Sequence, residues 1–216
     1  MKNFDGIIFD IDGTLTATNK LIFASFNHVA EKYLHKRLSN EEILAQFGPT
    51  EDVILKKWTE HKYDEARSDY YDFYEANHEE LADIFPGLKK VIEQIKSKNI
   101  PLGIFTGKGR ESSLITLKAF DILNCFDYIV TGDDVDEHKP SPEGINKFVD
   151  TYKLNRERVL MVGDAHVDVI AARDAGVKIA SVLWDSTYKE KVLALNPDFV
   201  FYTVAEFAEF ILNNLE

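Results

Sequence analysis

The sequence of 216 residues has few of the features that mark several classes of protein. Its single cysteine, Cys125, excludes an intramolecular disulfide framework and a zinc site built from several thiolates. No apolar stretch approaches the roughly 18 uninterrupted residues of a membrane span, and the N-terminal residues lack a signal-peptide pattern. We therefore expect a cytoplasmic protein with no membrane partner.

Basic residues are also scarce, with 25 Lys and Arg against 37 Asp and Glu, which gives a net charge of −12. A negative field of this size repels polyanions, so we expect no nucleic-acid partner. A small phosphorylated metabolite remains compatible with it, because local cations or a metal dominate within a screening length of about 8–10 Å.

Three common ligand-binding patterns are absent. An EF-hand that began with the acids at positions 10 and 12 would need Gly and Glu where Leu15 and Leu21 stand. The segment Thr-Gly-Lys-Gly at 106–109 lacks the preceding glycine spacing and the following Ser or Thr of a phosphate-binding P-loop. Ser112 stands where a dinucleotide fingerprint would place its third glycine.

Short β-branched runs alternate with helical patterns along most of the chain. The helical patterns include residues 88–95, between Pro-Gly and Pro, and residues 204–212. Such alternation predicts an α/β fold with a parallel, doubly wound sheet. The six predicted strands are Gly6–Phe9, Leu102–Phe105, Tyr128–Val130, Val159–Val162, Ile179–Leu183 and Asp198–Phe201.

The alternation stops between Ala17 and Asp83, where only helical patterns occur and no convincing strand is found. We therefore predict a core made of residues 1–16 and 84–216, and an all-helical insert over residues 17–83. Five residues of the insert share one helical face, which is typical of a small core of its own: Tyr63, Ala66, Tyr70, Phe73 and Tyr74.

Polar residues follow four of the strands or loops at the edge where ligands bind to an open parallel sheet. They lie at 10–16 (Asp-Ile-Asp-Gly-Thr-Leu-Thr), 106–108, 139–140 and 163–168 (Gly-Asp-Ala-His-Val-Asp). Several carboxylates gathered there repel one another, and Mg²⁺ is the natural compensating cation because it takes oxygen ligands. The set predicts a magnesium ion and a phosphoryl group at this edge.

The spacing of the first two acids also predicts a reaction. A carboxylate beside the metal, Asp10, can attack phosphorus, while Asp12 protonates the leaving oxygen and later deprotonates water. Thr106, with backbone N–H groups such as that of Gly107, can bind phosphoryl oxygens, and Lys139 can neutralise their charge.

In these four motifs, taken in order, the sequence resembles the haloacid dehalogenase superfamily of aspartate-nucleophile phosphohydrolases. The resemblance implies a Rossmann-like core with an inserted helical cap, like that of phosphoglycolate phosphatases, bacterial pyrophosphatases and β-phosphoglucomutases. It implies Asp10 as nucleophile and metal ligand, and Asp12 as general acid/base and backbone-carbonyl ligand. It further implies Asp164 as metal ligand, and Asp168 as a residue that orients metal-bound waters or Lys139.

Asp12 argues against two readings within the superfamily, because dehalogenases and phosphonate hydrolases lack an acid at that position. We predict a Mg²⁺-dependent phosphatase acting on a small phosphate monoester such as phosphoglycolate. A phosphosugar mutase, a pyrophosphatase and a non-catalytic protein that binds a phosphate ligand stay open, and the oligomeric state is not predicted. Weaker candidates for substrate contacts are Lys20, Glu51, Arg110 and His166.

Overall fold

The computed structural model describes residues 4–215, and a six-stranded sheet forms its centre. The strand order is β5-β4-β1-β6-β7-β8, and every neighbouring pair is parallel. The strands are β1 (Gly6–Phe9), β4 (Leu102–Phe105), β5 (Tyr128–Val130), β6 (Val159–Gly163), β7 (Lys178–Val182) and β8 (Phe199–Phe201). The predicted α/β fold is confirmed.

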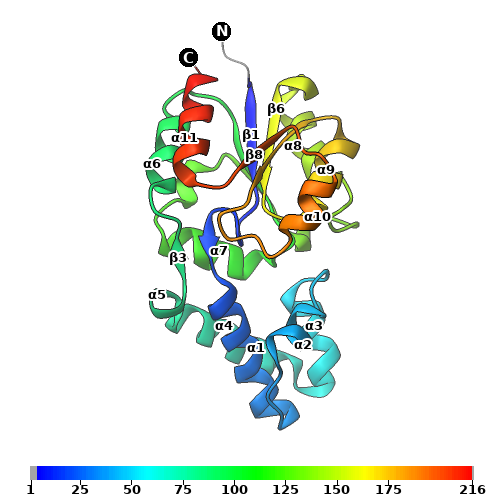
Figure 1. The fold of residues 1–216 in the computed structure, drawn as a ribbon. Helices are drawn as coiled ribbons and strands as arrows, with labels where there is room; N and C mark the ends of the chain where they lie inside the picture. Colours follow the sequence, from blue (N-terminus) through cyan, green and yellow to red (C-terminus); the bar gives the residue numbers. More distant parts are fainter. Residues whose placement is uncertain (1–3, 216) are drawn as a thin grey trace.

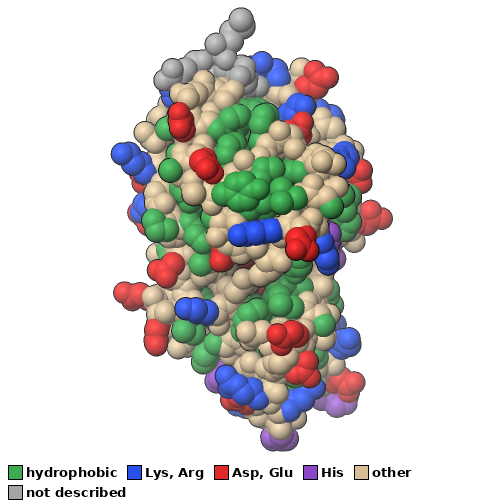
Figure 2. Space-filling model, in the orientation of Figure 1, with side chains coloured by type: hydrophobic (Ala, Val, Ile, Leu, Met, Phe, Trp, Pro, Cys, Tyr) green, Lys and Arg blue, Asp and Glu red, His purple; other side chains and the backbone are tan. Residues whose placement is uncertain are grey.

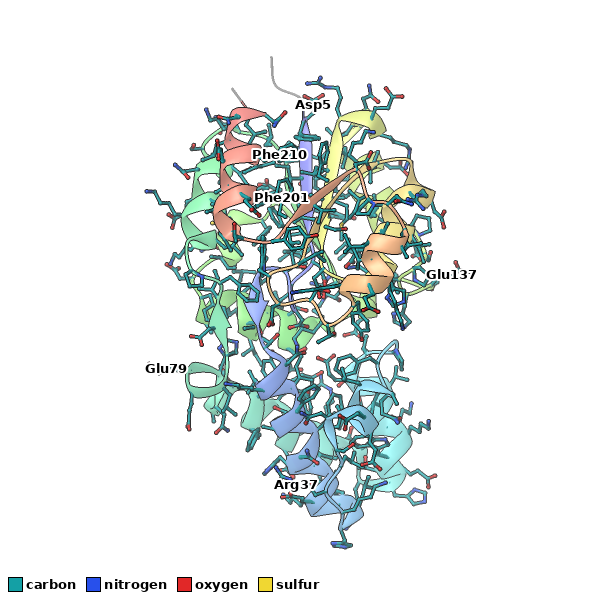
Figure 3. The ribbon with its side chains drawn as sticks, viewed as in Figure 1. Asp5, Arg37, Glu79, Glu137, Phe201 and Phe210 are labelled. Atoms are coloured by element: carbon teal, nitrogen blue, oxygen red, sulfur yellow. The ribbon has the colours of Figure 1, made fainter. Side chains whose placement is uncertain are left out.

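Helices cover both faces of this sheet, which explains why its central strands are apolar along their whole length (Figure 1). The helices α6 (Leu88–Lys96) and α11 (Val204–Asn213) pack on one face, and α8 (Glu143–Tyr152) and α9 (His166–Ala175) on the other. Phe201 and Phe210, whose ring centroids are 5.0 Å apart, lie between β8 and α11 (Figure 3). The remaining helices of this part are α7 (Arg110–Ala119), α10 (Lys189–Ala194) and three 3₁₀ turns, Leu123–Cys125, Gly132–Asp134 and Arg156–Arg158.

Local sequence sets several of the helix ends. At the start of α11, Thr203 accepts a hydrogen bond from the backbone N–H of Glu206, and the Glu206 carboxylate accepts one in return from the N–H of Thr203. The last turn of α9 closes on Gly176, whose φ of +71° is readily adopted by glycine. These caps set where α11 begins and where α9 ends.

A second, all-helical part follows β1 in the chain and lies below the sheet in Figure 1. We call α1–α5 the helical segment: α1 (Asn19–Leu34), α2 (Asn40–Leu44), α3 (Glu51–Thr59), α4 (Tyr63–Ala76) and α5 (His78–Leu81), with a 3₁₀ turn at Glu60–Lys62. It has its own apolar cluster, in which Phe26, Tyr70 and Tyr74 are buried. Arg37 and Glu79 lie on its outer side (Figure 3).

Two short strands join the helical segment to the rest of the protein. β2 (Thr16–Ala17) pairs antiparallel with β3 (Asp83–Ile84). The prediction that residues 17–83 contain no strand is therefore wrong at both ends of that range. Strands of two residues show no periodicity, and these two form because the chain leaves and re-enters the core at one point.

The described helices and the visible surface show neither a membrane span nor a basic patch. Within residues 4–215, no helix has both the length and the hydrophobicity required to cross a bilayer. Lys and Arg side chains are interspersed with Asp and Glu on the face drawn in Figure 2.

Candidate active site

The carboxyl ends of β4, β1 and β6 meet at the edge of the sheet that faces the helical segment. Asp10 follows β1, the central strand of the three, and its backbone N–H donates to the carbonyl of Val162 at 2.9 Å. Thr106 follows β4 and Asp164 follows β6, so the parallel register brings these residues to one place.

Three buried carboxylates form a cluster at this edge. Asp10, Asp164 and Asp168 each offer one oxygen, and the three oxygens lie within 4.8 Å of one another. Burial, aided by the neighbouring acids, raises the pKa of Asp10 to about 6 and raises the pKa of Asp164 well above its usual value. The cluster therefore favours the binding of a cation.

Lys139 is the ammonium group nearest to this cluster. Its Nζ donates to Oδ1 of Asp168 at 2.6 Å and lies 3.2 Å from Oδ1 of Asp10. The two carboxylates raise the pKa of Lys139 although burial opposes the shift, so the amine stays charged. Oδ1 of Asp10 is buried, and its contact with Lys139 lacks good hydrogen-bond geometry. Three buried carboxylates beside a single ammonium group fit a divalent cation such as Mg²⁺.

Asp168 and Gly13 support the cluster in different ways. The other oxygen of Asp168 accepts from the backbone N–H of Ala165 at 3.0 Å, so this carboxylate is fixed while it holds Lys139. Gly13 has a φ of +78°, and a side-chain carbon there would lie 2.6 Å from Oδ2 of Asp164. Only glycine therefore allows the loop after β1 to pass so close to Asp164.

The side chain of Asp12 is held by groups outside the cluster. The hydroxyl of Thr18 donates a hydrogen bond to Oδ1, and Nζ of Lys108 lies 3.3 Å from Oδ2. The side chain keeps 24% of its surface exposed, whereas the side chain of Asp10 keeps 12%. Asp12 is thus fixed next to Asp10 and stays open to the cavity.

Lys108 also lines this cavity, although no role was predicted for it from the sequence. Its side chain is only 2% exposed, and Nζ lies 3.3 Å from Asp12, 3.6 Å from Glu51 and 4.9 Å from the centre of the Tyr74 ring. The carboxylates raise its pKa against the opposing effect of burial. Its position two residues after Thr106 placed it in the predicted ligand-binding edge at 106–108, but its contacts with Asp12, Glu51 and Tyr74 were not predicted.

Glu51 reaches the core from the first residue of α3. One carboxylate oxygen accepts the backbone N–H of Gly109 at 2.6 Å, and the other accepts the hydroxyl of Ser112 at 2.6 Å. The two donors lie at the N-terminus of α7, where the helix dipole also favours a negative charge. Glu51 was a weaker candidate for a substrate contact in the sequence analysis. In the structure it lines the cavity and accepts hydrogen bonds from the core.

The other predicted positions fall into two groups. Thr106 is buried, and Thr106, Gly107 and His166 line the same cavity as Asp10. Two weaker candidates do not lie in that cavity: Lys20 is exposed, and Arg110 pairs with Asp134 at 2.6 Å.

The cavity has a volume of about 720 Å³ and lies between the sheet edge and the helical segment. One end holds the carboxylate cluster, Lys139 and Thr106. The other end is lined by apolar side chains from α1, α2, α3 and the loop before α3: Ile22, Phe23, Phe26, Leu44, Phe47 and Ile54. This volume suits a small organic ligand.

Known proteins resemble this chain in sequence and in fold. A pyrophosphatase named PpaX from Bacillus thuringiensis strain Al Hakam is 34% identical over 194 residues, which cover 90% of each chain. A crystal structure of a predicted phosphoglycolate phosphatase from Haemophilus somnus 129PT matches with a TM-score of 0.85 at 23% identity, over 97% of this chain and 99% of the other.

A proposed β-phosphoglucomutase from Thermotoga maritima matches with a TM-score of 0.74 at 27% identity, over 98% of both chains. The family model described as haloacid dehalogenase-like hydrolase matches residues 7–182, a range that includes both sheet-edge motifs with paired acids. This chain therefore belongs to the haloacid dehalogenase-like hydrolase family.

Proposed function

We propose that this protein is a Mg²⁺-dependent phosphatase that hydrolyses a small phosphate monoester through a phosphoryl intermediate on Asp10. The observation that carries the proposal is the buried cluster of the Asp10, Asp164 and Asp168 carboxylates, in which Asp10 and Lys139 line the same cavity. Carboxylate oxygens gathered in this way suit a hard cation, and a carboxylate beside such a cation can attack phosphorus.

The proposal assigns a role to each of these residues. Asp10 attacks phosphorus, and Asp12 gives its proton to the departing ester oxygen, then removes a proton from the water that releases phosphate. Thr106, the N–H of Gly107 and Lys139 bind the phosphoryl oxygens. Asp168 holds Lys139 in place.

The residues that would hold Mg²⁺ are Asp10, Asp164 and the backbone carbonyl of Asp12. Bound there, the ion neutralises charge on the phosphoryl group and on the carboxylates around it. Residues 17–83 then act as a cap that opens to admit substrate and closes over the sheet edge to exclude bulk water. The partner is a small phosphorylated metabolite of the cytoplasm, and phosphoglycolate is the first compound to test.

The proposal is tested by incubating the purified protein with Mg²⁺ and a panel of phosphoglycolate, sugar phosphates, nucleotides and pyrophosphate. Release of inorganic phosphate, ranked by kcat/KM, is the expected result, and Asp10→Asn is the matched inactive control. A metal-loaded protein that released phosphate from no member of the panel would be better described as a non-catalytic binding protein.

A second candidate is pyrophosphate hydrolysis, favoured by the PpaX relative at 34% identity. It predicts that pyrophosphate gives the highest kcat/KM of the panel, with two phosphates released per molecule. A phosphosugar mutase, suggested by the match to the Thermotoga maritima protein, predicts instead that a trace of bisphosphorylated sugar is required and that little free phosphate accumulates.

A further inference from the structure

The cavity offers many negative charges and few positive ones. Among the described residues that line it, seven carry carboxylates and two carry ammonium groups, with no arginine. The carboxylates are those of Asp10, Asp12, Glu41, Glu51, Asp164, Asp168 and Asp185, and the ammonium groups are those of Lys108 and Lys139.

Both ammonium groups are already paired with carboxylates of the protein. Lys139 lies between Asp10 and Asp168 at the end of the cavity that would bind the phosphoryl group. Nζ of Lys108 lies 3.3 Å from Asp12 and 3.6 Å from Glu51, although it donates no hydrogen bond to a described residue. A second anionic group on a substrate therefore meets a carboxylate of the protein beside each of the two cations.

Glu51 is fixed in this position and is not a mobile surface charge. Its side chain is 8% exposed, and its two oxygens accept hydrogen bonds of 2.6 Å from Gly109 and Ser112. An anionic substrate group could use Lys108 only by approaching this carboxylate or displacing it, and both are unfavourable in a site of low dielectric. Beyond Glu51, most of the wall is apolar, with Phe23 and Leu44 among its residues.

Building on the proposed phosphatase activity, we infer that Glu51 determines specificity by excluding a second negative charge from the cavity. The preferred substrate is a phosphate monoester whose alcohol portion is uncharged and carries an apolar chain. Phosphoglycolate, with a carboxylate near its scissile ester, and pyrophosphate, with a second phosphate across its scissile anhydride, are then poor substrates.

A matched pair of substrates tests this inference directly. Phosphoglycolate and 2-hydroxyethyl phosphate share a two-carbon skeleton and differ in the carboxylate. For the wild-type protein with Mg²⁺, kcat/KM is expected to be at least about tenfold higher for 2-hydroxyethyl phosphate. n-Butyl phosphate is expected to be better still, with up to about fourfold for each methylene that the apolar wall buries.

The variant Glu51→Gln removes the charge and keeps an amide that can still accept the N–H of Gly109. Lys108 then keeps Asp12 as its one neighbouring carboxylate and can also pair with the carboxylate of phosphoglycolate, so the preference for the uncharged ester is expected to fall at least about tenfold. Glu111→Gln is the matched control, since Glu111 pairs with Arg67 across the same contact and does not line the cavity. It should leave the preference unchanged.

The ratio of two kcat/KM values does not depend on the fraction of active protein, so partial misfolding does not disturb it. Should Glu51→Gln fail to fold, Glu51→Asp withdraws the charge by one methylene and is expected to lower the ratio in the same direction. A wild-type protein that prefers phosphoglycolate, or a Glu51 variant with an unchanged ratio, overturns the inference and leaves the phosphatase proposal standing. A preference for pyrophosphate overturns the inference and supports the second candidate, pyrophosphate hydrolysis. Hydrolysis of no ester at all overturns both.

Discussion

The two ends of the cavity are built in different ways. The sheet end takes Asp10, Thr106 and Asp164 from the ends of three neighbouring parallel strands. The other end takes its wall from separate helices and a loop of the helical segment, and Glu51 is the carboxylate that ties this segment to α7. Backbone topology positions the first end, and side-chain packing shapes the second.

This difference predicts two kinds of functional effect. Changes at the sheet end act on the phosphoryl group, which every substrate shares, so they should lower activity towards all substrates. Changes at the helical end act on the alcohol portion, so they should alter the ratio between substrates. The experiments that follow test that division.

Asp10→Asn is expected to have the largest effect. An amide is not a nucleophile towards phosphorus, and we expect kcat to fall by at least roughly 10⁴-fold for every substrate of the panel. Phosphate release with Mg²⁺ is the measurement, and Asp121→Asn, at an exposed position, is the control that should keep full activity. Residual activity of more than a few per cent would show that Asp10 is not the nucleophile.

Asp12→Asn should have the next largest effect, and its size should depend on the leaving group. Loss of a general acid costs roughly 10²–10⁴-fold, provided that the departing oxygen needs a proton. We expect a loss of that size in kcat/KM for n-butyl phosphate and a much smaller loss for 4-nitrophenyl phosphate, whose leaving group is stable as an anion. Equal losses for the two esters would show that Asp12 is not the acid.

The sequence predicted the sheet end of the cavity better than the helical end. Asp10, Thr106 and Asp164 each follow a short apolar run, and the parallel arrangement of those runs was enough to bring them together. The contact of Glu51 with Ser112 joins residues 61 positions apart on different helices, and no periodicity or spacing encodes it. Lys108 belongs to the predicted segment 106–108, but its contact with Glu51 could not be predicted because it depends on what the helical segment places beside it.

Mg²⁺ should stabilise the protein, and this effect belongs to the sheet end alone. Burial raises the pKa of Asp10 in the folded protein from the usual 3.8 to about 6, so between those values the folded protein binds more protons than the unfolded chain. Its contribution therefore favours the metal-free fold at low pH and is lost as the pH rises through about 6. Mg²⁺ competes with this proton and should bind more weakly at low pH.

Thermal unfolding with and without Mg²⁺ measures this competition. At a concentration about 100 times Kd, the ion should add roughly 2.7 kcal/mol, which corresponds to a rise in Tm of about 5–10 °C. The rise should be larger near neutral pH than near pH 5, and it should shrink in Asp10→Asn. A rise in Tm that is independent of pH and of this variant would place the ion elsewhere.

The smallest effect is expected from His78, which lies in the contact between the helical segment and α7. Its Nε2 is 3.2 Å from the hydroxyl of Thr116, and its ring packs 4.9 Å from that of Phe120. Burial, aided by Lys108, lowers the pKa of His78 from 6.5, so its contribution to stability is complete above 6.5 and is lost as the pH falls towards the folded pKa.

His78→Gln should lower the free energy of unfolding by about 1 kcal/mol near neutral pH, and its Tm should fall less on acidification than the Tm of the wild-type protein. His61→Gln, at an exposed position, should keep the wild-type profile. If the Tm of His78→Gln falls on acidification as much as the Tm of the wild-type protein, the pH sensitivity lies in the carboxylate cluster, and the contact with α7 contributes none of it.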